Sequence, residues 1–207
     1  SLKKILPGGE KNEVFKAYLD TIAFYANALE KENIPVIFRP FHEDTGGWFW
    51  WGASGADAYL QLYKLMYDRL TNVHGLNNLI WVWNGQDAAW YPGDEYVDII
   101  GEDIYPGKHV YTSQAARFIK ALSYTDTRKL ITLSENGCIP DPEQLVRDNI
   151  MWSYWCVWEG EFVLKAAGFN NYSEQYTEKN MLKKAYKSDT VITRKELPDL
   201  WNYPLGD

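Results

Sequence analysis

Apolar residues along the chain alternate between helical spacing and short continuous runs. In residues 12–33 the apolar positions at helical spacing are Val14, Phe15, Tyr18, Leu19, Ile22 and Tyr25. Pro35 prevents this helix from continuing, and the apolar run 34–41 predicts a strand buried on both faces. A second helix is predicted over residues 55–75, where Gly75 supplies the stop.

The same rhythm continues to the end of the chain. It predicts strands over residues 78–84, 96–105, 129–136 and 150–158, and helices over 113–125, 141–149 and 173–188. The helix over 141–149 is expected to begin with Asp141 as N-cap and Pro142 in its first turn. Five strands alternating with helices imply a parallel sheet with crossover helices, so we expect a single α/β domain over residues 1–207.

Polar residues stand where four of these strands end, namely Glu43, Asn84, Asp103 and Glu135. In a (β/α) barrel the carboxyl ends of the strands converge on one rim, where active sites are built. A polar residue after any one strand is ordinarily just the start of a loop. Four in succession favour a functional site over that simpler interpretation.

The two glutamates suit the cleavage of a glycosidic bond. One carboxyl group can protonate the leaving oxygen while the other attacks the anomeric carbon or activates water. The apolar sequence after Glu43 disfavours a charged carboxylate, which suits the acid, whereas Glu135 lies among small polar residues and can stay ionised. For either residue alone, a salt-bridged loop glutamate is an equal alternative.

Composition narrows the range of partners. The formal net charge of −7 leaves no basic stripe for nucleic acid, and no apolar run is long enough to span a membrane. Ten Trp and fifteen Tyr raise the aromatic content to 16%, which suits either a cleft that stacks on sugar rings or a large aromatic core.

Other chemistries lack their motifs. A zinc protease needs a histidine four residues after His42, where Gly46 stands, and no P-loop, dinucleotide fingerprint or serine-hydrolase elbow occurs. We therefore expect no metal and no cofactor. Cys138 and Cys156 are expected to be buried free thiols, with a single bridge as the alternative, and isolated His74 and His109 are expected to have structural roles.

The segments "RPFHEDTGGWFWWG" and "LSENG" resemble glycoside hydrolase family 26, best known for endo-β-mannanases, and "ILPGGE" fits the same family. The resemblance covers the whole chain. It implies a (β/α)8 TIM barrel, of which this chain carries strands four to eight, and a retaining mechanism with catalytic glutamates after strands four and seven. For that mechanism the two carboxyl groups are expected to lie about 5–5.5 Å apart.

The resemblance also implies roles for individual residues. Glu43 would be the acid/base and Glu135 the nucleophile. His42 would hydrogen-bond the sugar, Trp48 would stack on substrate, and Tyr105 would orient the nucleophile. Trp158 would be a sugar platform, with Trp155 as the alternative. Arg39 would support the carboxylates from below, and at least two of Phe49, Trp50 and Trp51 would pack under the loop.

The same resemblance implies the protein's partners and setting. The leading expectation is endo-hydrolysis of β-1,4-mannan, with a mixed-linkage β-glucan, a β-1,3-xylan or sugar binding without turnover as alternatives. The parent protein would act outside the cell or at its surface. Because the first three strands of the barrel are absent from this sequence, we expect an N-terminal segment or a second copy to complete it.

Overall fold

The computed structural model describes residues 2–165, 171–200 and 202–203. The strands are β1 (Val36–Phe38), β2 (Leu79–Trp83), β3 (Ile99–Ile104), β4 (Leu130–Asn136) and β5 (Trp155–Val157). The helices are α1 (Asn12–Glu30), α2 (Ala56–Tyr67), α3 (Ala115–Leu122), α4 (Pro142–Asp148) and α5 (Lys179–Tyr186). The strands form one sheet in the order β1-β2-β3-β4-β5, and β1–β2 and β2–β3 pair in parallel. This sequential order confirms the predicted α/β class.

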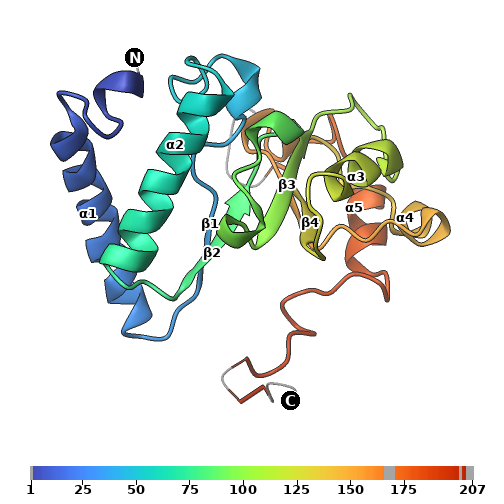
Figure 1. Cartoon of the computed structure of the whole chain (residues 1–207). Coiled ribbons are helices and arrows are strands. Elements are labelled where there is room, and N and C mark those ends of the chain that lie inside the picture. The colour runs from blue at the N-terminus through green and yellow to red at the C-terminus, as the bar shows by residue number, and fades with distance from the viewer. Residues whose placement is uncertain (1, 166–170, 201, 204–207) are drawn as a thin grey trace. The chain divides into compact units, whose positions relative to one another are not determined.

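The chain divides into two compact units. The first unit, residues 1–103, 116–134 and 152–154, holds α1, α2, β1, β2 and most of β3, β4 and α3. Its helices α1 and α2 lie next to each other (Figure 1). Leu19 of α1 and Tyr59, Leu62 and Met66 of α2 are almost completely buried. The core of this first unit is therefore formed by aromatic and aliphatic side chains that α1 and α2 bury.

The second unit consists of residues 104–115, 135–151 and 155–207. It begins at the carboxyl ends of β3 and β4 and includes β5, α4 and α5. Asp141 caps α4, since its side chain accepts a hydrogen bond from the backbone N–H of Glu143, and Pro142 occupies the first turn. Lys184 of α5 bonds the same Asp141 carboxylate at 2.8 Å. The predicted cap is thus confirmed, and it also joins two helices.

Two of the expected strands are much shorter in the structure. β1 spans three residues, and Ile37 is 56% exposed, so the prediction of a strand buried on both faces is wrong. Pro40 cannot donate to a ladder and Phe41 has a positive φ, which together end the strand. β1 is also an edge strand, because among the described residues it pairs with β2 alone.

The segment before β5 lies alongside β4 without being a regular strand. The N–H of Ser153 donates to Ile131 O and the N–H of Leu133 donates to Tyr154 O. The predicted strand over 150–158 is therefore present as an extended path, of which only Trp155–Val157 forms β5. The last helix likewise begins later than predicted, at Lys179.

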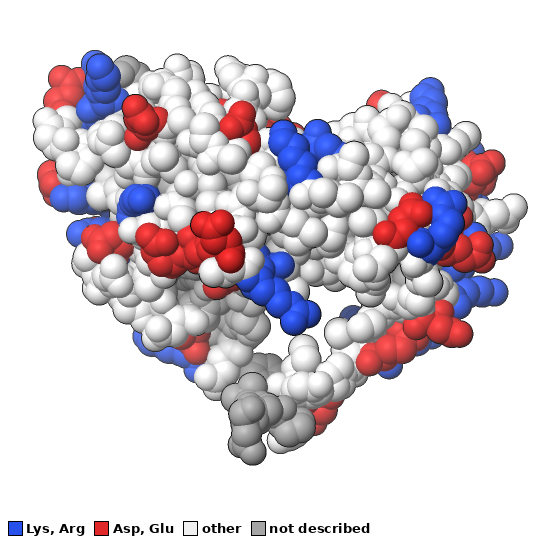
Figure 2. Space-filling view, turned by 45° about the vertical axis from the view of Figure 1, so that its right-hand side comes forward, with Lys and Arg blue, Asp and Glu red and all other residues white. Residues whose placement is uncertain are grey.

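The charged side chains on the surface are distributed as the sequence predicted. On the face in Figure 2, acidic and basic side chains are interspersed over the described residues, with no continuous basic stripe. None of the described helices combines the length and apolar character that a membrane span requires. Both cysteines are free, but Cys156 is exposed, so the prediction of a buried thiol holds only for Cys138. Position 156 lies on the exposed face of a strand in which Trp155 and Val157 are partly buried.

Candidate active site

In the first unit, Glu43 is held on a tight turn directly after β1. Its backbone is in the left-handed region, with φ 51° and ψ 40°, and it precedes a short 3-10 turn, Asp44–Gly46. The N–H of Glu43 donates to Asn84 O at 2.9 Å, and Gly46 N–H donates to Glu43 O at 3.0 Å. A left-handed glutamate is uncommon and needs such support, so the end of β2 fixes the direction of this carboxyl group.

Trp48 bends back over the turn onto Glu43. Its indole N–H donates to Glu43 Oε2 at 3.0 Å, while 66% of the residue stays exposed. A Cβ at position 46 would lie 2.2 Å from the Trp48 ring, so only glycine allows this approach. Trp48 therefore presents a broad exposed ring and positions a carboxylate at the same time. The sequence predicted the ring but not the hydrogen bond.

The rest of the aromatic run supports the turn from beneath. Phe49 and Trp51 stack with ring centroids 4.3 Å apart, and both are partly buried. The indole N–H of Trp51 donates to His42 O at 2.7 Å, and the His42 ring lies 4.8 Å from that of Phe49. Trp50 stays 53% exposed. The expectation that two of the three aromatics pack under the loop is confirmed, with Phe49 and Trp51 as the pair.

Beneath Glu43, a polar cluster joins residues at the ends of four strands, β1 to β4. Arg39 Nη1 donates to Asn84 Oδ1 at 2.9 Å and lies 3.2 Å from Asp103 Oδ2. Ser134 Oγ donates to Asp103 Oδ1 at 2.7 Å. Among the described contacts, Arg39 thus pairs with Asp103 and reaches the Glu43 turn through Asn84. The buried Asp103 is the center of this cluster, a role that its position alone could not reveal.

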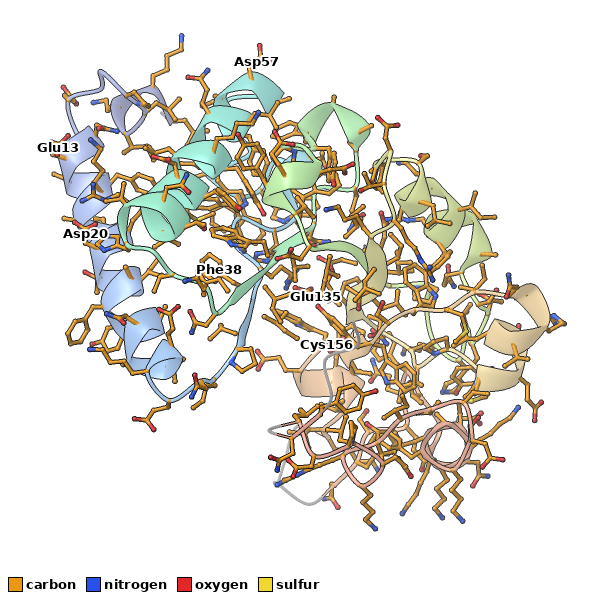
Figure 3. The ribbon with its side chains drawn as sticks, turned by 60° about the horizontal axis from the view of Figure 1, so that its bottom comes forward. Glu13, Asp20, Phe38, Asp57, Glu135 and Cys156 are labelled. Atoms are coloured by element: carbon orange, nitrogen blue, oxygen red, sulfur yellow. The ribbon has the colours of Figure 1, made fainter. Side chains whose placement is uncertain are left out.

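In the second unit, Glu135 lies near the end of β4, where it is 5% exposed (Figure 3). The Tyr105 hydroxyl donates to Glu135 Oε2 at 2.7 Å. A short bond from a phenol to a carboxyl oxygen fixes the orientation of that carboxyl group. The pairing that the resemblance implied for these two residues is therefore present.

One side of Tyr105 packs against an aromatic ring. The ring of Phe162 lies 5.4 Å from that of Tyr105 and 4.1 Å from that of Tyr176. A Cβ on Gly137 would meet Phe162 at 3.1 Å and Tyr105 at 3.3 Å, so this glycine leaves room for both rings. Nothing in the spacing of the sequence indicated Phe162, because it follows β5 on a loop.

The predicted sugar platform lies at the end of β5. Trp158 is 41% exposed and its N–H donates to Asn136 O at 3.0 Å, which ties it to the strand of Glu135. Trp155 lies on the other face of the strand and is partly buried. Of the two tryptophans, Trp158 is thus the more exposed.

An α/β fold that presents oriented carboxylates and exposed indole and phenol rings after its strands is the architecture of barrel-type glycoside hydrolases. Residues 2–196 match the family described as Glycosyl hydrolase family 26, and the chain belongs to that family. In the (β/α)8 barrel of this family the chain accounts for strands four to eight.

Known relatives agree with this assignment. The chain is 38% identical over 179 residues to a mannan endo-1,4-beta-mannosidase of Thermothelomyces thermophilus, a match that covers 86% of this chain and 35% of the relative. Among solved structures it resembles a ruminal GH26 endo-beta-1,4-mannanase, with a TM-score of 0.85, 33% identity, and 96% and 44% of the two chains covered.

A second structure, the beta-mannanase from a symbiotic protist of the termite Reticulitermes speratus, complexed with gluco-manno-oligosaccharide, gives a TM-score of 0.84 at 33% identity, with 95% and 58% covered. The chain thus spans about a third of the length of the curated relative above and about half of these solved chains.

Proposed function

We propose that the protein containing this chain is a retaining endo-β-1,4-mannanase. The observation that carries the proposal is the bond from the Tyr105 hydroxyl to Glu135 at 2.7 Å, because it orients a buried carboxyl group, as a nucleophile requires. Family membership and the mannanase names of the relatives support the substrate class.

Glu43 serves as the acid/base in this mechanism. It first protonates the leaving glycosidic oxygen while Glu135 attacks the anomeric carbon, which forms a covalent glycosyl–enzyme. It then removes a proton from the water that hydrolyses this intermediate. The Trp48 N–H, 3.0 Å from Glu43 Oε2, fixes the carboxyl group so that its other oxygen can face the leaving group. Two inversions at one carbon give overall retention.

Binding of the polysaccharide falls to rings and polar groups beside these carboxylates. The exposed faces of Trp48 and Trp158 suit stacking on pyranose rings, and His42 supplies a hydrogen-bonding group next to the acid/base. Neither role needs a metal or an organic cofactor.

The test is product analysis on linear mannan, mixed-linkage β-glucan and β-1,3-xylan with the protein at its full natural length. Short manno-oligosaccharides whose new reducing ends are first seen as the β-anomer by NMR are the expected result. Release of the α-anomer would refute retention. Hydrolysis of glucan or xylan but not of mannan would show that the proposed substrate is wrong. Binding of mannan without hydrolysis would show that the protein is a sugar-binding protein and not an enzyme.

We further propose that the protein acts outside the cell or at its surface, since a polymeric substrate does not enter cells intact. Enzyme activity found only in washed, lysed cells would contradict this location. The barrel itself would be completed by an N-terminal segment or by a second copy of the chain.

A further inference from the structure

Asp44, the residue after the proposed acid/base, is a buried carboxyl group that the mechanism does not use. It is 0% exposed, and neither Oδ1 nor Oδ2 has a hydrogen-bond partner among the described residues. Buried carboxylates are ordinarily paired or hydrogen-bonded, because an uncompensated charge in a protein interior is costly. An unpaired one therefore calls for an explanation.

The backbone closes tightly around this side chain. A Cβ on Gly85 would lie 2.7 Å from Asp44 Oδ2, and a Cβ on Gly52 would lie 2.0 Å from Asp44 O. The Thr45 hydroxyl donates to Gly85 O at 2.8 Å, which closes the turn onto the end of β2. Asp44 is thus enclosed in the same turn that directs Glu43.

Burial favours the neutral form of Asp44 and raises its pKa to about 7. The titratable groups that face it are Tyr59 and Tyr63 from α2 and Asp87 from the loop after β2. Asp87 raises the pKa further, while the nearby Tyr59 hydroxyl and Trp83 indole act in the opposite direction. The Trp83 N–H is buried with no hydrogen-bond partner among the described residues, and the Tyr59 hydroxyl donates to Phe41 O at 3.4 Å.

We propose that Asp44 is a positioning residue for Glu43. Neutral Asp44 holds the turn in its working conformation, and ionised Asp44 disturbs that turn. An ionised Asp44 draws the Tyr59 hydroxyl away from Phe41 O and the Trp83 N–H toward itself. Phe41 and Glu43 both have φ near 50° and depend on such local support. Ionisation therefore changes the backbone that aims the acid/base.

The effect on catalysis rests on the proposed function, so the experiment needs readouts with and without turnover. The proteins are the full-length parent, Asp44→Asn and, as a matched control, Asp87→Asn. In the parent, the infrared band of a protonated carboxylic acid is expected at pH 6 and lost by pH 8. Asp44→Asn removes that band, and Asp87→Asn only moves its loss to a lower pH, because one like charge is gone.

The ionisation of Asp44 also makes the stability of the folded protein depend on pH. Since the pKa of Asp44 is raised from 3.8 to about 7 on folding, its contribution to stability is full below pH 4 and is lost as the pH rises to 7. The Tm of Asp44→Asn is therefore expected to exceed that of the parent at pH 8. At pH 4 the Tm of the variant is expected to equal that of the parent or to lie below it.

Turnover is measured with a manno-oligosaccharide, whose poor leaving group needs the proton of Glu43. The kcat/KM of the parent, divided by that of Asp44→Asn, is expected to be about tenfold lower at pH 8 than at pH 6, because Asp44 with a pKa of about 7 ionises between these values. Asp44→Asn is expected to lack this part of the decline, and a decline that remains in the variant belongs to Glu43 and other groups. An unchanged pH profile in an active Asp44→Asn, or the absence of the infrared band from the parent at pH 6, overturns the proposal. If no glycoside is cleaved, the proposed function fails, yet the infrared and Tm results still decide the state of Asp44.

Discussion

At the scale of single residues, Glu43 and Glu135 differ in how they are held. Glu43 is partly buried on a turn, where it accepts an indole N–H, and Glu135 accepts a phenol O–H at the buried end of a strand. A group that must exchange protons with substrate and water needs access, whereas a nucleophile needs a fixed orientation. The difference between the two settings therefore matches the roles that we propose.

Glu43→Gln provides the residue-scale prediction. Loss of the acid should lower kcat on substrates with poor leaving groups by about 10²- to 10⁴-fold, because general acid catalysis supplies a factor of that size. The first step on aryl glycosides with good leaving groups should fall much less, since they depart without a proton. Steady-state kinetics on both substrate types are the measurement.

The control for this variant is Glu32→Gln, at an exposed position after α1, which should leave both activities unchanged. An equal loss on both substrate types in Glu43→Gln would assign Glu43 a role other than acid. Circular dichroism should show that the variant is folded, because glutamine can still accept the Trp48 N–H.

The sequence predicted where these residues lie, after β1 and near the end of β4, because their positions follow from strand ends. Their catalytic roles stay a prediction. It did not predict their partners. The Trp48–Glu43 bond depends on the missing side chain of Gly46, and the enclosure of Asp44 depends on the approach of Gly52 and Gly85. Such contacts arise from the path of the backbone in three dimensions, which no periodicity encodes.

At the scale of elements, helices were predicted more closely than strands. α1 and α4 match their predicted ranges because amphipathic spacing and caps are local signals. β1 is shorter than its apolar run because prolines at both ends, Pro35 and Pro40, cut the hydrogen-bonded part to three residues. The long helix predicted over 55–75 is real, but it ends in a π-helical turn, Asp68–Val73.

That π-helical turn is tied to α1 by a cluster of three ionisable groups. Asp20 accepts from Arg69 through two bonds of 2.8 and 2.9 Å, and His74 Nε2 lies 2.7 Å from it. These bonds, Arg69 first and His74 second, lower the pKa of Asp20 from 3.8 to about 2. Because the pKa is lowered on folding, the cluster stabilises the fold above pH 4 and this contribution is lost as the pH falls toward 2.

Asp20→Asn is therefore expected to have a lower Tm than the parent at pH 7. The difference in Tm is expected to disappear as the pH approaches 2. The side chain is partly open to water, so we expect a change under about 1 kcal/mol in the free energy of unfolding. Thermal denaturation of parent and variant across this pH range is the measurement. Asp126→Asn, at an exposed turn, is the control and should show no pH-dependent deficit. A constant gap at every pH would mean that the introduced asparagine disturbs packing instead of removing a charge.

At the scale of the whole molecule, helix α1 has two apolar faces. One is buried in the first unit and includes Phe15, Leu19 and Ala23. The other lies in the solvent and consists of Val14, Tyr18, Ile22, Tyr25 and Leu29. The helical pattern in the sequence showed both sets of residues, but it could not show that only one of them is covered by other described residues.

Beside the second face lies an open groove of about 640 Å³, whose lining includes Ile5, Phe15 and Trp50. The neighbouring β1 is an edge strand and leaves one row of backbone groups without a partner strand among the described residues. Monomeric soluble proteins rarely expose continuous apolar patches beyond a few hundred Å², and free strand edges promote pairing. Both features favour association.

We therefore expect the isolated 207-residue chain to associate at micromolar concentration, with itself or with an added N-terminal segment of the parent protein. Sedimentation velocity and light scattering measure this directly. Tyr18→Lys, on the exposed stripe of α1, should shift the chain toward the monomer because a charge opposes burial of that face. Ile119→Lys is the matched control, since Ile119 is 61% exposed on α3, in the same unit but on another helix. If the unmodified chain is a compact monomer, the exposed apolar face of α1 does not drive association. Equal effects of the two substitutions would show that general hydrophobicity, and not the stripe, drives the association.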